Sequence, residues 1–441
     1  MSTLGPIVRL QPNLLSFSTP DVIPQIYGYN DVPTRIDPKQ GPKPSGNALP
    51  RSLFYLGVER PPGIPTVISS RPNDLHTRLR KRASAAYSQT RIVGMESGVD
   101  QMVKLFITKI RNFAGIGSER TATAFDFAVW AQYFTFDTVL MLTHSKPHGF
   151  MEHSSDYMDY ISNVLKGLTL FNYINHFPWL IYVLRTKALQ RFAPKESDKE
   201  GLGHLMGIGR QTVRQRLAEI NQGAEKKHDI LQGLVDAKSE SPEKAQASED
   251  EILAETMIPF VAGSDSTATA IRAVVLELAL HPTVLAKLRQ ELHQAWKNGL
   301  ISEPVQLAET SKLRYLDAVI RESMRTRPST SVIFRREVPI SSEGLLIYDA
   351  GGPYKSPIKI PPGTEVGMNP YVIAKSTELY GQDSRDFRPE RWSPASDEAA
   401  EVERVKHMER LDFAFLWGPR TCLGKGIATM EIRKSVIEVC D

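Results

Sequence analysis

The feature of this sequence that most constrains its fold is a helical pattern of about thirty residues in the middle of the chain. It begins at residues 248–251 (SEDE), where the serine and the second glutamate can each satisfy a free backbone N–H group at a helix start. It ends before Pro282, which stops the helix. Pro259 lies inside the pattern and removes one backbone hydrogen bond, so we expect a kink near Gly263. This is the longest helix that the sequence predicts.

Helical spacing also dominates other parts of the chain. Between residues 75 and 184 apolar residues recur three and four positions apart, and further helices are expected at 312–326 and 424–438. Residues 33–74 are instead rich in proline and glycine, which predicts a long loop with little regular structure.

Strand-like patterns are confined to two places. A hairpin is expected near residues 7–17, and β-type runs alternate with glycine and proline turns between residues 332 and 366. We therefore expect a mainly α protein with a small β region (α+β). We expect a single domain over residues 1–441, with β-rich parts at about 4–35 and 332–372.

Composition excludes several classes of protein. Apolar residues make up 41% and charged residues 24% of the chain, which is ordinary globular usage and excludes disordered and collagen-like chains. The net charge of +4 is too small for a nucleic-acid binder whose whole surface is basic. Two cysteines cannot form a disulfide framework, and we expect neither a signal peptide nor a transmembrane anchor, because no apolar run reaches roughly 20 residues. A reducing compartment is expected.

The most informative segment is residues 415–424, FLWGPRTCLG. Cys422 comes just before a predicted helix, where free N–H groups and the helix dipole lower a thiol pKa and stabilise a thiolate that can bind a metal. Gly418 and Gly424 allow close backbone approach, and Arg420 can hold an anionic cofactor group. Taken alone, the cysteine could equally be a buried structural residue.

This segment matches the heme-binding signature of the cytochrome P450 superfamily, F-x-x-G-x-R-x-C-x-G, at every position, beginning at Phe415. The resemblance implies that Cys422 is the thiolate ligand of a heme b iron and that Arg420 lies near a heme propionate. Thiolate ligation in this family favours cleavage of the O–O bond. The resemblance also implies a P450 fold, with heme between the long helix and the Cys422 loop.

A second motif, AGSDST at residues 262–267, lies in the long helix. An acid beside a hydroxyl on a kinked helix can relay protons, which assigns Asp265 and Ser266 to general acid chemistry. The alternative is a serine that bonds back to its own helix. In the family this is the oxygen-activation motif, with Ser266 where a threonine is usual and Thr267 following it.

Glu322 and Arg325 are three residues apart in the predicted helix 312–326, which favours an ion pair on one face. The same spacing recurs at Glu401 and Arg404, and an exposed pair of this kind is worth little. The resemblance assigns Glu322, Arg325 and Arg391 to a buried structural network.

A predicted basic helix begins near His76 and includes Arg80. By itself, its run of charges indicates a helix face that is exposed to solvent. In the family the matching helix brings two such residues to the heme propionates, which assigns that role to His76 and Arg80. Arg336 matches a further propionate-binding arginine, although Arg335 could take its place.

Two competing motifs fail. Residues 41–47 have the glycine spacing of a P-loop but Asn47 in place of the phosphate-binding lysine. His144 and His148 have zinc-ligand spacing, but Pro147 interrupts the helix that would align them.

The resemblance covers nearly the whole chain and is greatest to filamentous-fungal members that act in secondary metabolism. It implies a monooxygenase that inserts one oxygen atom from O2 into an apolar small molecule, with electrons from NADPH delivered by a reductase. A heme-thiolate isomerase, dehydratase or reductase, and a truncated inactive heme-binding remnant, are the alternatives. Substrate shape would be read by loop 53–67, helices near 160–210, the face 258–262 and residues 329–334.

The family is usually anchored on the cytoplasmic side of the endoplasmic reticulum. The sequence predicts neither the N-terminal anchor nor the strands that follow the final helix in family members, and an apolar surface near residues 171–184 is a possible membrane contact.

Overall fold

A computed structural model describes residues 5–28, 36–37, 41–42, 48–59, 63–116, 121–184, 186–190, 194–199, 201–237, 247–348 and 357–440. Parts of the predicted loop 33–74 and of the β-rich segments 4–35 and 332–372 lie outside these described residues. The described chain is mainly helical with small sheets, as the sequence predicts.

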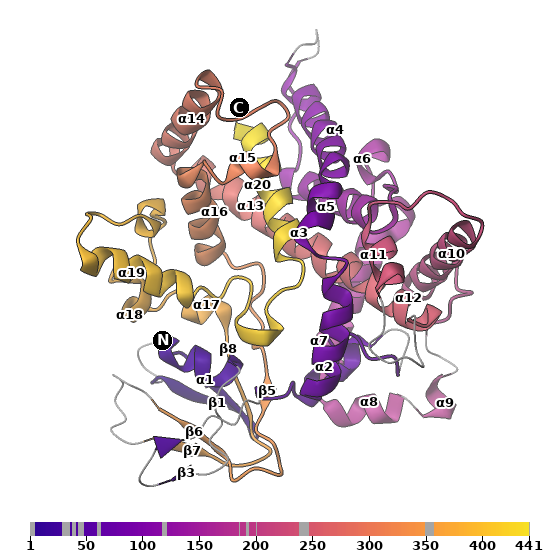
Figure 1. Cartoon of the computed structure of the whole chain (residues 1–441), viewed down its shortest axis with the longest axis vertical. Helices are drawn as coiled ribbons and strands as arrows, with labels where there is room; N and C mark the ends of the chain where they lie inside the picture. Colours follow the sequence, from indigo (N-terminus) through magenta and orange to yellow (C-terminus); the bar gives the residue numbers. More distant parts are fainter. Residues whose placement is uncertain are drawn as a thin grey trace.

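Helices account for most of the described chain (Figure 1). The longer ones are α2 (Asn73–Ser84), α4 (Glu96–Ala114), α5 (Phe127–His144), α7 (Tyr160–Asn175), α10 (Gly201–Asn221), α12 (Glu249–Ile258), α13 (Ser264–Leu280), α14 (Pro282–Lys297), α16 (Arg314–Thr326), α19 (Ala399–Arg410) and α20 (Lys425–Cys440). The shorter ones are α1 (Ile23–Tyr27), α3 (Gln89–Gly94), α6 (Phe150–His153), α8 (Pro178–Leu184), α9 (Lys187–Gln190), α11 (Ile230–Asp236), α15 (Leu307–Thr310), α17 (Pro370–Ile373) and α18 (Thr377–Tyr380). Short segments of 3-10 helix are η1 (Pro20–Val22), η2 (Leu53–Val58), η3 (Tyr157–Asp159), η5 (Pro389–Trp392) and η6 (Gly418–Arg420).

The strands gather at one end of the molecule, where the N-terminal strands lie beside strands from residues 336–368 (Figure 1). A four-stranded sheet has the order β1 (Ile7–Gln11), β2 (Leu14–Phe17), β8 (Glu365–Met368) and β5 (Arg336–Glu337). The pairs β3 (Ile36–Asp37) with β4 (Gly41–Pro42) and β6 (Leu345–Ile347) with β7 (Ile358–Ile360) are separate. The predicted hairpin near 7–17 is confirmed as the antiparallel pair β1 and β2.

The long central helix forms as expected and is interrupted at the expected place. The Ser248 side chain and the Glu251 side chain complete a capping box at its start. Between α12 and α13 the chain makes a π-helical turn, η4 (Pro259–Gly263), because a proline cannot donate the usual backbone hydrogen bond. The helix ends at Leu280, and α14 leaves at an angle of 109°.

Across the described part of the chain, no single helix combines the length and apolar composition that a bilayer span needs. The bent pair formed by Glu249–Leu280 and Pro282–Lys297 passes that test as a unit.

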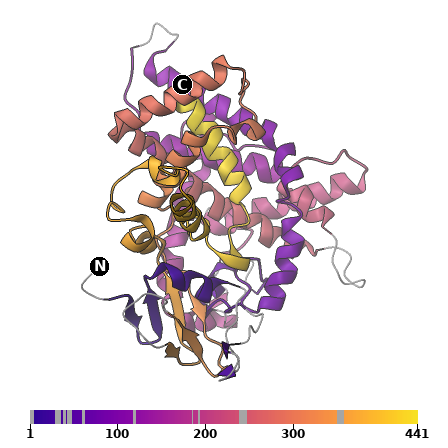
Figure 2. The same ribbon diagram turned by 60° about the vertical axis from the view of Figure 1, so that its left-hand side comes forward.

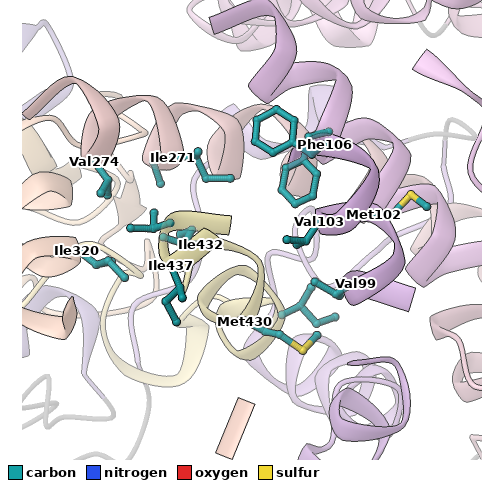
Figure 3. Close-up of a cluster of buried hydrophobic side chains, with 14 of the residues drawn as sticks. Val99, Met102, Val103, Phe106, Ile271, Val274, Ile320, Met430, Ile432 and Ile437 are labelled. Atoms are coloured by element: carbon teal, nitrogen blue, oxygen red, sulfur yellow. The ribbon is translucent and has the colours of Figure 1, made fainter. Parts of the chain in front are cut away.

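The main hydrophobic core joins helices from all parts of the chain (Figure 3). Side chains of α4, α13, α16 and α20 meet there, and α5 packs along α13. In Figure 2 the yellow helix α20 lies among the other helices, in agreement with its packing against α4 and α13. The segment just before α20 is therefore fixed by a helix that is buried in the core.

A second hydrophobic cluster lies between the four-stranded sheet and the segment before α20. Its centre is Tyr27, whose ring lies 5.0 Å from that of Phe413. The Tyr27 hydroxyl donates to the Phe334 carbonyl oxygen at 2.8 Å and accepts from the Met368 N–H at 2.8 Å. This cluster ties the N-terminal helix α1 to the segment that carries Cys422.

Candidate active site

Cys422 lies three residues before α20, at the end of a compact turn. Its N–H donates to the Phe415 carbonyl oxygen at 2.9 Å, and the Thr421 hydroxyl donates to the same oxygen at 2.9 Å. The backbone N–H groups of Gly424 and Lys425 point at its sulfur and lower the thiol pKa. The structure thus confirms that Cys422 lies at the start of a helix, as the sequence predicts.

The two glycines of this turn differ in what they require. Gly418 has φ of +74°, and a Cβ atom there would lie 2.0 Å from the Tyr27 carbonyl oxygen, so only glycine fits. Gly424 was expected to permit close backbone approach, but a Cβ atom there would meet no atom of the chain within 4 Å. The chain leaves open space beside Gly424.

Open space also faces Cys422. Its side chain is exposed although the next helix is buried. Ala262 is exposed as well, although it lies in the middle of the central helix, between buried neighbours such as Phe260 and Ser264. Exposed side chains on interior elements indicate a recess that protein atoms do not fill.

The net direction of the Cys422 pKa differs from the expected one. Although the Cys422 side chain is open on one side, the protein atoms packed around the thiol remove part of its hydration. This loss of hydration raises the thiol pKa by more than the N–H groups of Gly424 and Lys425 and the charges of Arg80 and Lys425 lower it. The sequence pattern identifies the N–H groups but not the loss of hydration, which depends on the whole fold. The prediction of a lowered thiol pKa is wrong for the chain by itself.

Beside this recess lies a cation cluster, which we define as His76, Arg51, Arg336 and Arg420. All four side chains are buried, and within the described ranges none of the three arginines forms an ion pair with a carboxylate. Burial and the neighbouring arginines lower the pKa of Arg420 to about 8 and that of Arg51 to about 10. Burial followed by four arginine charges lowers the pKa of His76 to about 3.

Backbone carbonyl groups hold the cation cluster in place. Arg420 donates to the carbonyl oxygens of Ser70 and Arg71 at 2.8 and 3.0 Å, and also to the Asn73 side chain. Its Nε atom is buried and has no hydrogen-bond partner within the part of the chain that the structure describes, and the same is true of Nε2 of His76. Polar atoms left without partners in a buried site are uncommon and indicate a missing acceptor.

Arg80, also predicted for this site, adjoins the cluster. It donates to the Thr421 carbonyl oxygen at 2.8 Å, next to Cys422, and its charge lowers the pKa values of His76, Arg51 and Arg420. The helix start therefore connects to the cation cluster through Arg80.

The structure distinguishes between Arg335 and Arg336. Arg335 pairs with Glu365 at 3.1 Å and lies over the Phe54 ring. Arg336 lies over the Tyr27 ring at 4.9 Å and acts electrostatically on Arg420 and His76. Arg336 is the member of the pair that belongs to the cation cluster.

Sequence reasoning missed Arg51. It lies in the proline-rich loop, forms an isolated β-bridge with Arg336, and donates to the Val67 carbonyl oxygen at 3.2 Å. A single arginine in a loop gives no periodic or motif signal, so only the fold reveals its place.

These observations fit a heme whose iron is bound through sulfur. A cysteine sulfur would bind the iron, and the Cys422 side chain and that of Ala262 on the central helix are both exposed. A buried cluster of positive charge can bind two carboxylates, which a heme carries as propionates. The sulfur donor of Cys422 suits a heme iron, and the positive charge of the cation cluster suits the heme propionates.

Asp265, Ser266 and Thr267 lie on the first turn of α13, after the π-helical turn. Asp265 accepts from Gln132 on α5 at 3.2 Å, and Gln132 in turn accepts from Arg272 at 2.6 Å. The Ser266 hydroxyl donates to the Ala262 carbonyl oxygen at 2.7 Å, which is the back-bonding that the alternative interpretation describes. Thr267 is buried.

The Glu322 network, which we define as Glu322, Arg325 and Arg391, is assembled and fully buried. Glu322 pairs with Arg325 at 2.8 Å and with Arg391 at 3.2 Å, and it accepts from Trp392 Nε1 at 2.9 Å. Burial alone would raise the pKa of Glu322, but the bonds and charges of these partners hold it below its usual value. The similar pair Glu401–Arg404 is partly exposed.

The histidines at 144 and 148 line a small cavity with Tyr160, away from Cys422. Burial lowers the pKa of both histidines. Among the described residues no group of three or more metal-ligating side chains could hold an ion.

Comparison with known proteins agrees with the site. The family model described as Cytochrome P450 matches residues 51–439. The chain is 32% identical to cytochrome P450 monooxygenase pkfB of Emericella nidulans, covering 98% of this chain and 77% of that protein. It is 28% identical to a cytochrome P450 monooxygenase of Aspergillus terreus, covering 98% and 81%.

It is also 31% identical to cytochrome P450 monooxygenase mpaDE of Penicillium roqueforti, of which it spans 47%. These relatives are fungal oxidoreductases of the monooxygenase class.

Proposed function

Because the chain belongs to the cytochrome P450 family, we propose that it is a heme-dependent monooxygenase that inserts one oxygen atom from O2 into an apolar small molecule. The observation that carries the proposal is the pairing of Cys422 at a helix start with an adjacent buried cation cluster whose arginines have no carboxylate partner among the described residues. The fungal relatives support a substrate from secondary metabolism.

Cys422 would bind the iron of heme b, and the cation cluster together with Arg80 would hold its propionates. Phe415, Gly418 and Gly424 shape the turn around the sulfur. When bound, a thiolate-ligated heme supplies the activation of dioxygen. The protein binds the group, excludes water from it and orients the substrate against it.

Proton delivery is assigned to Asp265 and Ser266, with Thr267 beside them. The Gln132 bond orients Asp265, and the hydrogen bond from Ser266 to the Ala262 carbonyl oxygen holds the hydroxyl at the π-helical turn. A hydroxyl keeps acceptor capacity when it donates, so Ser266 can accept a proton from water in this position. To pass a proton on, it would release its bond to the Ala262 carbonyl oxygen and donate its own hydrogen to the reacting oxygen instead.

Electrons come from NADPH through a cytochrome reductase. The exposed basic side chains of Arg78 and Lys81 on α2, beside Arg80, offer a surface for an acidic partner.

The protein is proposed to work on the cytoplasmic side of the endoplasmic reticulum, where family members are usually anchored. Large apolar side chains are exposed on α7, on α8 and between them, which favours contact with a membrane surface. They are Leu165, Leu170, Tyr173, Phe177, Trp179, Tyr182, Val183 and Leu184.

The test of the heme assignment is anaerobic reduction of the purified full chain under carbon monoxide. We expect the red-shifted Soret band of thiolate-ligated heme, and we expect Cys422→Ser to lose it. Cys440→Ser is the matched control, since Cys440 is the other cysteine and is buried at the end of α20. A thiolate-type spectrum that survives in Cys422→Ser contradicts the assignment.

Isotopic oxygen separates a monooxygenase from a heme-thiolate isomerase, dehydratase or reductase. With NADPH, a reductase and labelled O2, the product should carry one labelled atom. Ser266→Ala should consume NADPH with little product, whereas Ser266→Thr should remain coupled because it keeps the hydroxyl. Equal coupling in Ser266→Ala and the parent would remove Ser266 from the proton path.

A further inference from the structure

Lys425 is the first residue of α20, three positions after Cys422, and the proposed chemistry does not use its side chain. The residue is exposed, and its Nζ atom lies 5.4 Å from the centre of the Phe415 ring. A cation within about 6 Å of the centre of an aromatic ring is attracted to the face of the ring. The ring therefore favours one position of the Lys425 ammonium group over the many that a free lysine would sample.

The same ring belongs to the turn that carries Cys422. The Phe415 carbonyl oxygen accepts from the Cys422 N–H and from the Thr421 hydroxyl, both at 2.9 Å. The backbone N–H of Lys425 points at the Cys422 sulfur. Lys425 is thus connected to the cysteine turn at two points, through its backbone at the sulfur and through its ammonium group at the ring.

Among the described residues, the cations whose charges act on the Cys422 sulfur are Arg80 and Lys425. Arg80 adjoins the cation cluster, where propionates would offset its charge. Lys425 lies at the start of α20 and is not part of that cluster. Its charge also acts on Asp412, but no ion pair joins the two within the described ranges. Lys425 is therefore the cation whose charge would still act on the sulfur once heme is bound.

A positive charge beside this sulfur affects the uptake of an electron. Reduction of a bound iron from ferric to ferrous adds one electron, forms and breaks no bond, and makes the site more negative by one charge. A nearby cation lowers the energy of the more negative state. Because Lys425 is exposed, water and salt screen its charge, so we expect an effect that is small and that depends on salt.

We propose that Lys425 is a positioning residue whose ammonium group, held over the Phe415 ring, raises the reduction potential of an iron bound to Cys422. The inference rests on the proposed function, in which a reductase supplies the electron. A higher reduction potential makes the transfer of that electron to the iron more favourable.

Spectroelectrochemical titration of the purified, heme-loaded chain tests the proposal. Lys425→Met removes the charge and keeps an apolar stem over the ring, so the equilibrium constant for reduction in about 10 mM salt should fall about threefold. This fall is a shift of about 28 mV, because a tenfold change corresponds to about 59 mV for one electron. Lys425→Arg keeps a cation that can lie over the ring and should retain the parent potential. A parent potential equal to that of Lys425→Met would overturn the proposal, and so would a Lys425→Arg potential as low as that of Lys425→Met.

The dependence on salt distinguishes an effect of charge from a disturbance of the turn. The Debye length falls from about 30 Å in about 10 mM salt to about 3 Å in about 1 M salt. The difference in potential between the parent and Lys425→Met should therefore fall by at least half over this range. If the difference were the same at both salt concentrations, the substitution would act through the structure of the turn, and the proposal would be wrong.

The role of the Phe415 ring is tested by combining two substitutions. In a chain that carries Phe415→Leu, Lys425→Met should shift the potential by less than half as much as it does in the parent, because no ring then holds the ammonium group near the sulfur. Equal shifts in the two backgrounds would contradict the proposal.

Lys297→Met is the control variant, because Lys297 is also exposed and is the last residue of α14. It should leave the potential unchanged, and a fall equal to that of Lys425→Met would mean that any exposed lysine has this effect, against the proposal. If Lys425→Met does not take up heme, Lys425→Gln removes the same charge and should show the same fall.

The carbon monoxide spectrum separates this inference from the proposed function. A thiolate-type spectrum in the parent, together with equal potentials in the parent and Lys425→Met, refutes only the role of Lys425. An absent spectrum refutes the heme assignment on which both depend.

Discussion

The Glu322 network and the cation cluster bury guanidinium groups in opposite electrostatic surroundings. In the Glu322 network, Arg325 and Arg391 share a buried carboxylate, Arg391 also pairs with Asp383 at 2.6 Å, and carbonyl oxygens accept from other N–H groups of both arginines. In the cation cluster the arginines meet one another and His76, and their pKa values fall. Burying a charge is costly unless an opposite charge accompanies it.

This difference separates a structural group from a binding group. The chain compensates the Glu322 network by itself, so that network contributes to the stability of the fold. The cation cluster lacks compensation within the described chain, so it is suited to an anionic ligand that arrives after synthesis.

Breaking the Glu322 network should have the largest effect. Glu322→Gln leaves buried Arg325 without its carboxylate and leaves buried Arg391 with Asp383 alone, which should lower the free energy of unfolding by about 3 to 5 kcal/mol. Urea denaturation followed by circular dichroism measures it. Glu401→Gln is the matched control, because its pair with Arg404 is partly exposed and should be worth less than about 1 kcal/mol. If both variants lost the same free energy of unfolding, the assignment of Glu322 to a stabilising buried network would be wrong.

The cation cluster should make the stability of the heme-free protein depend on pH. His76 has a folded pKa of about 3, well below that of an unfolded histidine, so the unfolded state binds a proton first as the pH falls. Above about pH 6.5 His76 is neutral in both states, and the stability of the heme-free protein should not change with its protonation. Between about pH 6.5 and pH 5 the unfolded state gains a proton that the folded state does not, so the free energy of unfolding should fall by about 2 kcal/mol.

Denaturation curves of the heme-free protein at several pH values measure this loss. His76→Gln should show a flatter profile over the same range, and so should the heme-loaded parent, because propionates would offset the arginine charges. If the stability of the heme-free parent varied with pH as little as that of His76→Gln, the arginines of the cation cluster would not hinder protonation of His76, and the prediction would be wrong.

The smallest expected effect distinguishes two neighbouring arginines. Arg336→Met removes a repelled charge but keeps an apolar stem over the Tyr27 ring, so the heme-free protein should change in stability by less than about 1 kcal/mol. Heme transfer to apomyoglobin should become about tenfold faster. Arg335→Met is the control: it breaks the pair with Glu365 and should lower stability without accelerating heme loss. The reverse pattern would place Arg335, and not Arg336, at the propionates.

Much of this arrangement follows from local sequence. The position of Cys422 at a helix start, the capping box and the interruption of the central helix after Pro259 depend on residues a few positions apart, and all three occur where the sequence predicts them. The sequence predicted a kink at the interruption, and the structure has a π-helical turn there. Glu322 and Arg325 also form a local pair, although only the resemblance distinguishes them from Glu401 and Arg404, since burial is not a local property.

Other features depend on the assembled fold and leave no local pattern. Arg51 joins the cation cluster from a loop, and the choice between Arg335 and Arg336 depends on which one Glu365 pairs with. The sequence predicted a lowered pKa for the Cys422 thiol, whereas the pKa is raised. The loss of hydration that raises it results from every element packed around the thiol, so no local pattern reveals it.

The parallel pairing of β2 with β8 has a consequence for how the protein is made. Leu14 aligns with Glu365, so the first strands to leave the ribosome have to wait for a partner that is translated some 350 residues later. Until then their apolar face needs temporary cover, from a chaperone or from nascent helices. Slowing translation before β8 should therefore lower the yield of native enzyme more than an equal pause after it.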